Sequence, residues 1–310
     1  MVEQKRLKHL IESQQLDKDL LFDLFKRADE LRNNGRYAET LKGKVLTTLF
    51  YEPSTRTRLS FESAMLRMGG QVMGTENARE FSSVVKGESL EDSIRVIAGY
   101  SDAIVMRHNE TGSAAKAAEV SPVPIINAGD GKGQHPTQAL LDAYTLNREF
   151  GRVDDLKIAM VGDLASGRTV RSLCYLLGKF DNNKITFVSP ENLKMGEDIK
   201  EYLDSHNVDY EEETDLKCVL PFVDVIYMTR IQKERISIED YEKAKGKYVI
   251  NKNNFGLVSP DSRIMHPLPH VEEIDLPINI EQNNKRVAYF RQAENGLYAR
   301  MALLENMLGA

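Results

Sequence analysis

The chain has 310 residues, of which 41% are hydrophobic and 28% charged, and its formal net charge is −6. This length suits one large or two medium domains, and the mixed charge excludes a basic surface that would attract nucleic acid. No segment reaches the ~18 uninterrupted apolar residues of a membrane span, and the N-terminal residues lack a signal-peptide core. A cytoplasmic protein is expected. Cys174 and Cys218 match no zinc or redox spacing, so both are expected to be structural thiols in apolar settings.

In chain order, the first half alternates helical spacing with short runs rich in β-branched residues. Apolar residues at helical spacing predict a packing helix around Leu21–Leu31. Strands are predicted at 44–50, 71–73, 103–106 and 124–128, with helices from about Pro53 to Met68 and from Ser89, where Asp92 completes a capping box.

A helix over about 137–150 is expected to join this half to a second one of the same kind. There the predicted strands are 157–161, 184–188, 224–228 and 262–265, and a packing helix ends the chain. Alternating strands and helices predict an α/β fold of two lobes, each a doubly wound parallel sheet, with the active site in the cleft between them. The predicted domains are 1–137 with the terminal helix 288–310, and 138–287.

Polar clusters follow six of the predicted strands. Ligands of parallel sheets bind beyond the carboxyl ends of the strands, so these clusters indicate a site for an anionic ligand set. Four clusters contain arginine. The clusters are Pro53–Arg58, Arg107–His108, Gly129–Gln138, Gly162–Thr169, Thr229–Gln232 and His266–Pro269.

The first cluster predicts a phosphate site. Pro53 can open a helix, whose first N–H groups then point outward from the positive end of the helix dipole. Ser54, Thr55 and Thr57 add hydroxyl donors, Arg56 adds a planar fork, and Arg58 is expected to serve structure. The polar stretch Arg79–Glu88, which includes Lys86, reads as a mobile loop.

Two alternatives remain open from the residues alone. Gly162–Thr169 fails as a dinucleotide motif because Leu164 stands at the second glycine, but it fails as a P-loop only through Arg168 in place of lysine. A P-loop NTPase is therefore one alternative. The other is a two-lobed binding module without catalysis.

The motifs together resemble the carbamoyltransferase family. Ser54–Arg58 with Ser60–Glu62, and His135–Gln138, are similar to its carbamoyl phosphate signatures. Lys86–Ser89, Met106–His108, Thr229–Arg235 and His266–Pro269 resemble the catalytic chain of the aspartate-specific branch, and the last motif lacks the cysteine expected of an ornithine enzyme. The resemblance runs from the first strand to Asn295–Tyr298.

This resemblance implies transfer of the carbamoyl group of carbamoyl phosphate to the amino group of L-aspartate, a step of pyrimidine synthesis, with no cofactor and no metal. It implies that the phosphate is held by Ser54, Thr55, Arg56, Thr57 and Ser82. The carbonyl oxygen would meet Thr57, Arg107 and His135, and the carbamoyl amide would meet Gln138 and the carbonyls of Pro267 and Leu268. The aspartate carboxylates would meet Lys86, Arg168, Thr169, Arg230 and Gln232.

The family further implies a homotrimer in which Ser82 and Lys86 enter the site of a neighbouring subunit. A separate regulatory subunit, or another pyrimidine enzyme, is left open as a partner. The sequence departs from the common family pattern at Ala165, Ser166, Arg171 and His270, which flank the donors.

Overall fold

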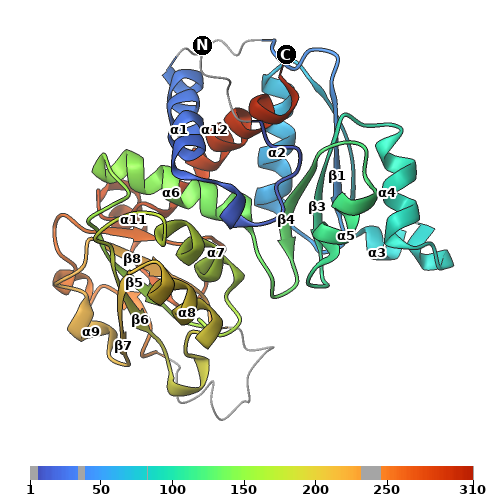
Figure 1. The fold of residues 1–310 in the computed structure, drawn as a ribbon. Helices are drawn as coiled ribbons and strands as arrows, with labels where there is room; N and C mark the ends of the chain where they lie inside the picture. The colour runs from blue at the N-terminus through green and yellow to red at the C-terminus, as the bar shows by residue number, and fades with distance from the viewer. Residues whose placement is uncertain (1–5, 34–38, 82, 232–245, 310) are drawn as a thin grey trace. The chain divides into compact units, whose positions relative to one another are not determined.

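The computed structural model describes residues 6–33, 39–81, 83–231 and 246–309, and contains two compact units (Figure 1). Unit 1 comprises Met1–Tyr144 with Glu294–Ala310, and unit 2 comprises Thr145–Ala293. The division falls within helix α6 (Pro136–Phe150) and again within α12 (Tyr289–Leu308). Two helices are therefore shared between the units.

Unit 1 is built on a four-stranded parallel sheet in the order β2-β1-β3-β4. Nearly every residue of β1 is buried, because helices cover both faces, with α2 and α4 on opposite sides in Figure 1. The strands are β1 (Val45–Phe50), β2 (Gln71–Glu76), β3 (Ala103–His108) and β4 (Ile125–Asp130). The helices are α1 (Lys18–Asn33), α2 (Thr55–Arg67), α3 (Ala78–Phe81), α4 (Leu90–Ala98) and α5 (Ser113–Val120), with short η1 (Ser13–Gln15) and η2 (Ser83–Lys86).

Unit 2 is built on a five-stranded parallel sheet in the order β10-β8-β5-β6-β7. Its strands are β5 (Lys157–Val161), β6 (Lys184–Val188), β7 (Asp209–Glu213), β8 (Val225–Met228) and β10 (Arg263–Met265). Its helices are α7 (Arg168–Leu177), α8 (Glu197–Ser205), α9 (Leu216–Val219) and α11 (Ile278–Asn283), with η3 (Glu191–Leu193) and η5 (Phe255–Leu257). A separate small sheet pairs β9 (Ile250–Asn251) with β11 (Ile274–Asp275).

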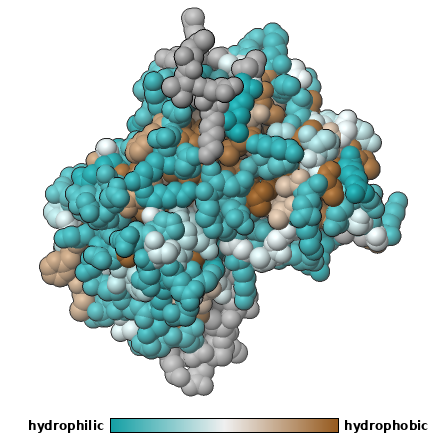
Figure 2. All heavy atoms as spheres, viewed as in Figure 1, coloured by the Kyte–Doolittle hydropathy of each residue, from teal (hydrophilic) through white to brown (hydrophobic). Residues whose placement is uncertain are grey.

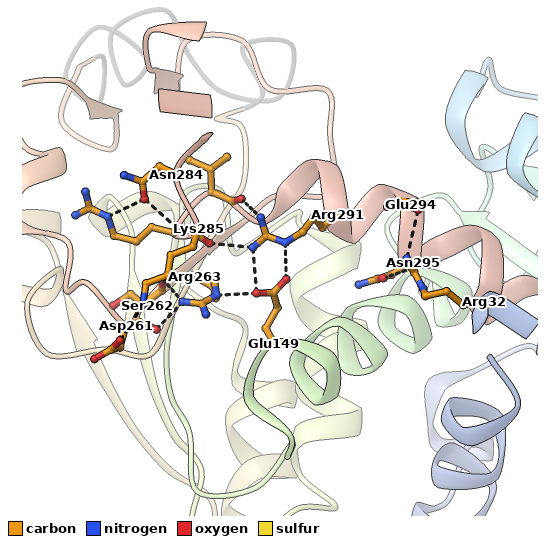
Figure 3. A network of polar contacts seen from close by, with 12 residues as sticks. Arg32, Glu149, Asp261, Ser262, Arg263, Asn284, Lys285, Arg291, Glu294 and Asn295 are labelled. Carbon is orange, nitrogen blue, oxygen red and sulfur yellow. Dashed lines mark hydrogen bonds and ion pairs between the residues drawn. The ribbon is translucent and has the colours of Figure 1, made fainter. Parts of the chain in front are cut away.

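Glu149, near the end of α6, ties several parts of unit 2 together (Figure 3). Its carboxylate accepts hydrogen bonds from Arg263 Nε at 2.6 Å and from Arg291 Nε at 2.7 Å. Burial acts to raise the pKa of Glu149, but the two guanidinium groups hold it below its usual value. The group thus anchors α6 to β10 and to the first turns of α12.

The predicted α/β class with one parallel sheet in each lobe, the eight strands and the main helices are confirmed, and Ser89 accepts a hydrogen bond from Asp92 N as expected of its cap. β7 was not predicted, because its sequence Asp-Tyr-Glu-Glu-Glu has no apolar run; it is an edge strand whose charges face solvent. The prediction that both cysteines lie in apolar settings is wrong for Cys218. Cys174 is buried, but α9 turns Leu216 and Val219 inward and leaves Cys218 exposed.

Polar and charged side chains cover most of the face shown in Figure 2, as the composition predicts. Within the described ranges, no helix is long and apolar enough to cross a membrane.

Candidate active site

The hydrogen-bond donors that are predicted to bind phosphate lie where the strand order of unit 1 reverses. From β1 the sheet extends to β2 on one side and to β3 and β4 on the other, and Phe50 pairs with Arg107 across β1 and β3. Ligands of open α/β sheets bind outside the carboxyl ends of the strands at such a reversal. The segment Ser54–Thr57 follows β1 at this point, beside Arg107 at the end of β3.

Helix α2 begins at the same edge with Ser54 as its N-cap. Ser54 has an extended backbone and makes no side-chain cap hydrogen bond to the helix. Its hydroxyl therefore leaves the first-turn N–H groups uncapped, and these groups and the helix dipole favour an anion here. Thr57 is buried, whereas Thr55 and Arg56 are exposed. This turn can thus receive phosphate from the solvent side. Arg58 pairs instead with Glu62 of the same helix at 3.5 Å, as its expected structural role requires.

Arg107 is held by the loop that follows β1. Its Nε donates to Glu52 Oε2 at 3.2 Å, and its Nη1 donates to Ser54 Oγ at 3.4 Å. Burial lowers the pKa of Arg107, while the Glu52 carboxylate acts to raise it. A guanidinium stays protonated in proteins, so Arg107 supplies a positive charge next to the α2 N-terminus. Glu52 was not singled out from the sequence.

His135 and Gln138 lie at the start of α6, in the segment that follows β4. Both side chains are buried. The Thr137 hydroxyl lies 3.3 Å from His135 Nδ1, and when it donates there the ring proton sits on Nε2, which can donate to an oxygen. Gln138 Nε2 donates to Asp142 Oδ1 at 2.9 Å. Asp142 was missed from the sequence, although its place one helical turn after Gln138 is a signal.

Unit 2 has a strand-order reversal of its own, between β5 and β8. Arg168 and Thr169 follow β5 at the start of α7, and Arg230 follows β8, so the sheet places these three half-buried residues at neighbouring strand ends. Gly162 has φ +118°, and a Cβ there would lie 2.4 Å from the Thr229 carbonyl oxygen. The two loops therefore pack closely because residue 162 is glycine.

The loop after β10 is ordered by His266. Its Nδ1 accepts a hydrogen bond from Leu268 N at 2.7 Å, and its Nε2 lies 2.9 Å from Glu273 Oε1. Burial lowers the pKa of His266, which favours the neutral ring that this pattern requires. Leu268 has φ +55° and a cis peptide bond to Pro269. The hydrogen bond from Leu268 N to His266 holds the backbone segment that carries the Pro267 and Leu268 carbonyls.

Ser82 and Gln232 lie outside the described residues. Lys86 ends η2 with its side chain exposed. Two departures from the family pattern have partners in unit 2: Arg171 pairs with Asp198, and His270 Nε2 lies 3.3 Å from Glu281 Oε1.

Comparison with known proteins decides the family. The model of the aspartate/ornithine carbamoyltransferase carbamoyl phosphate-binding domain matches residues 8–148, and that of the aspartate/ornithine-binding domain matches residues 154–307. The chain belongs to the aspartate/ornithine carbamoyltransferase family. The resemblance predicted from the motifs is confirmed, and family membership leaves the P-loop alternative without support.

Within the carbamoyltransferase family, similar proteins carry the aspartate name. Aspartate carbamoyltransferase 3, chloroplastic, of Pisum sativum is 55% identical over 98% of this chain and 78% of its own length. The catalytic subunit of M. jannaschii aspartate transcarbamoylase is 48% identical with a TM-score of 0.88, covering 96% of this chain and 98% of that one. The Trypanosoma cruzi enzyme in complex with N-(phosphonacetyl)-L-aspartic acid is 37% identical with a TM-score of 0.91, covering 97% and 96%.

In the described part of this carbamoyltransferase chain, no three histidine, cysteine or acidic side chains cluster in a way that could hold a metal ion.

Proposed function

We propose that this chain transfers the carbamoyl group of carbamoyl phosphate to the amino group of L-aspartate, giving N-carbamoyl-L-aspartate and phosphate. Family membership supports the reaction class, and relatives at 45% to 55% identity carry the aspartate name. The observation that carries the proposal is the pair of strand-order reversals, one in each unit. The hydrogen-bond donors assigned to phosphate follow the strands at the reversal in unit 1. Arg168 and Arg230 follow the strands at the reversal in unit 2.

Carbamoyl phosphate is assigned to the donors of unit 1. Its phosphate binds the first turn of α2, where Ser54–Thr57 supply backbone N–H groups, hydroxyls and the Arg56 guanidinium, with Ser82 added from a neighbouring subunit. Its carbonyl oxygen accepts hydrogen bonds from Thr57, Arg107 and His135. Buried Gln138, with the carbonyls of Pro267 and Leu268, binds the carbamoyl NH2 group.

L-Aspartate is assigned to the cations of unit 2. Its two carboxylates pair with Arg168 and Arg230, and Thr169, Gln232 and Lys86 complete the set. A planar guanidinium suits a carboxylate because it can donate two parallel hydrogen bonds. The segment His266–Pro269 lacks the cysteine expected of an ornithine enzyme, which favours aspartate.

The chemistry follows from this assignment. The aspartate nitrogen forms a bond to the carbonyl carbon, the bond from that carbon to the phosphate oxygen breaks, and the departing phosphate can take the amine proton. Negative charge grows first on the carbonyl oxygen, which Arg107 and His135 stabilise. Donors preorganised for such charge are commonly worth about 3–4 kcal/mol each.

Assembly is part of the proposal. Lys86 and Ser82 act in the site of a neighbouring subunit, so a homotrimer is the active form. The M. jannaschii relative is described as a catalytic subunit, which supports an oligomer and leaves a regulatory chain open. A cytoplasmic location stays a prediction, since the Pisum sativum relative is chloroplastic.

A carbamoylation assay with isotopically labelled carbamoyl phosphate tests the function. L-Aspartate and L-ornithine are compared as acceptors at equal concentration, with product identified by mass spectrometry. Labelled N-carbamoyl-L-aspartate is expected, with little product from ornithine. Preference for ornithine would overturn the acceptor assignment, and no product from either would overturn the reaction.

A further inference from the structure

Gln138, Asp142 and Arg300 form a buried polar group inside unit 1. Gln138 donates its side-chain amide to Asp142 Oδ1 at 2.9 Å. Asp142 is fully buried, and Arg300 of α12 is 4% exposed. Burial lowers the pKa of Arg300 to about 10, and the Asp142 charge acts to raise it. Arg300 is therefore a cation at neutral pH that attracts the Asp142 carboxylate.

Phe61 and Gly296 form the space that holds the Arg300 guanidinium. Its guanidinium carbon lies 5.1 Å from the centre of the Phe61 ring. A Cβ at Gly296, one helical turn earlier in α12, would lie 2.5 Å from Arg300 Nη1. Glycine inside a helix costs stability relative to alanine, so Gly296 is explained by the room that it leaves for the guanidinium.

We propose that Asp142 and Arg300 are positioning residues that fix the amide orientation of Gln138 and so make the site select a carbamoyl group over its methyl analogue. The proposal rests on the function proposed above. An ionised carboxylate only accepts hydrogen bonds, so Asp142 can bind the Gln138 NH2 group but not its carbonyl oxygen. Gln138 Oε1 is then the atom left to face the substrate.

This orientation decides which acyl phosphate binds well. Oε1 accepts a hydrogen bond from the carbamoyl NH2 group, whereas the methyl group of acetyl phosphate has no donor and leaves Oε1 without a partner. A site built to bind an N–H group rejects an analogue that lacks it, because its own polar atom is left unpaired. If the amide were free to turn, its NH2 group would face the carbamoyl NH2 group, and the preference would fall.

The test compares carbamoyl phosphate with acetyl phosphate in the wild-type enzyme and in Asp142→Asn. Asparagine has nearly the same shape, but its oxygen is expected to face the Arg300 cation and its NH2 group to donate to Gln138 Oε1, so the turned orientation of Gln138 becomes the favoured one. The KM for carbamoyl phosphate is expected to rise roughly five- to tenfold, the size of one lost hydrogen bond. The inhibition constant of acetyl phosphate is expected to change less than twofold. An unchanged ratio of the two constants would overturn the proposal.

Two further measurements separate positioning from a general fold defect. The exchanged pair Gln138→Glu with Asp142→Asn places the acceptor at 138 and the donor at 142, and should restore the preference lost in Asp142→Asn. Failure to restore it in a folded protein would contradict the proposal. In the wild type, acetyl phosphate binding as tightly as carbamoyl phosphate would also contradict it. If wild-type enzyme makes no N-carbamoyl-L-aspartate, the proposed function fails instead.

Discussion

Arg107 donates a hydrogen bond to Glu52 across 3.2 Å, and this contact ties the end of β3 to the loop that follows β1. The same guanidinium reaches Ser54 Oγ at 3.4 Å. Because Ser54 starts the helix that is assigned to phosphate, a single arginine links that helix to the position assigned to the carbonyl oxygen. The geometry of this fork, and not only its charge, should therefore matter.

Arg107→Lys tests that geometry. Lysine keeps the charge, but its ammonium is a point donor that cannot reproduce the fork to Glu52, Ser54 and substrate. We expect kcat/KM for carbamoyl phosphate to fall at least 100-fold, the usual cost of one oxyanion donor. Arg95→Lys is the matched control, because Arg95 pairs on the surface with Asp92 at 3.4 Å. Activity within threefold of wild type in Arg107→Lys would contradict the assignment.

The proposed sharing of each active site between two subunits predicts complementation between inactive chains. Lys86→Ala and Arg107→Ala should each be inactive, but mixed trimers should recover part of the activity. In some of their sites Arg107 would come from a Lys86→Ala chain and Lys86 from a neighbouring Arg107→Ala chain. Arg107→Ala mixed with His135→Ala is the control. Both of those residues belong to the same chain's share of the site, so no hybrid site is intact. No recovery in the first mixture, with exchange verified by native mass spectrometry, would argue against a trimer with shared sites.

Buried His266 predicts acid sensitivity of unit 2. Burial lowers its pKa below the unfolded value of 6.5, so the unfolded chain takes up the proton first as pH falls. The contribution of His266 to the free energy of unfolding is therefore fully present above about pH 6.5. Below that pH the contribution falls, by at most about 1.4 kcal/mol per pH unit.

Urea unfolding of wild type and His266→Asn between pH 7.5 and 5.5 measures this effect. The variant should be less stable at pH 7.5 but should lose less stability on acidification. His206→Asn, at an exposed position, is the control for removal of a histidine as such. Equal pH slopes in wild type and His266→Asn would show that His266 does not stay neutral in the fold.

Gly162→Ala should destabilise unit 2. The new Cβ would lie 2.4 Å from the Thr229 carbonyl oxygen, at a backbone φ of +118° that alanine rarely adopts. We expect a loss of about 2 kcal/mol or more in the free energy of unfolding, with a weaker affinity for aspartate, because the loop carrying Arg230 must shift. Gly256→Ala is the control, since a Cβ there meets nothing within 4 Å. A free energy of unfolding equal to that of Gly256→Ala would show that residue 162 does not lie so close to the Thr229 carbonyl oxygen.

Local physics made much of this structure predictable. Apolar runs located eight parallel strands, and Pro53 with Ser54 marked the start of α2. β7 was missed because its stability comes from pairing with β6 and from ion pairs such as Lys200 with Glu212, not from an apolar pattern.

The partners of the candidate site residues could not be predicted from the sequence. Arg300 lies far from Asp142 in the sequence, and only the return of α12 to unit 1 brings their charges together. Glu52 likewise lies close to Arg107 only because the strand register pairs Phe50 with Arg107. Such pairs depend on tertiary packing, which periodicity does not reveal.

The central claim is that the donors of both units act on one ligand set. Calorimetric titration with N-(phosphonacetyl)-L-aspartic acid, which joins a phosphonate to an aspartate, tests it most directly. Wild type should bind one molecule per chain, and both Arg56→Ala in unit 1 and Arg168→Ala in unit 2 should weaken binding at least 100-fold. Arg67→Ala, at the far end of α2, should bind as wild type does. Full affinity in either Arg56→Ala or Arg168→Ala would contradict the account.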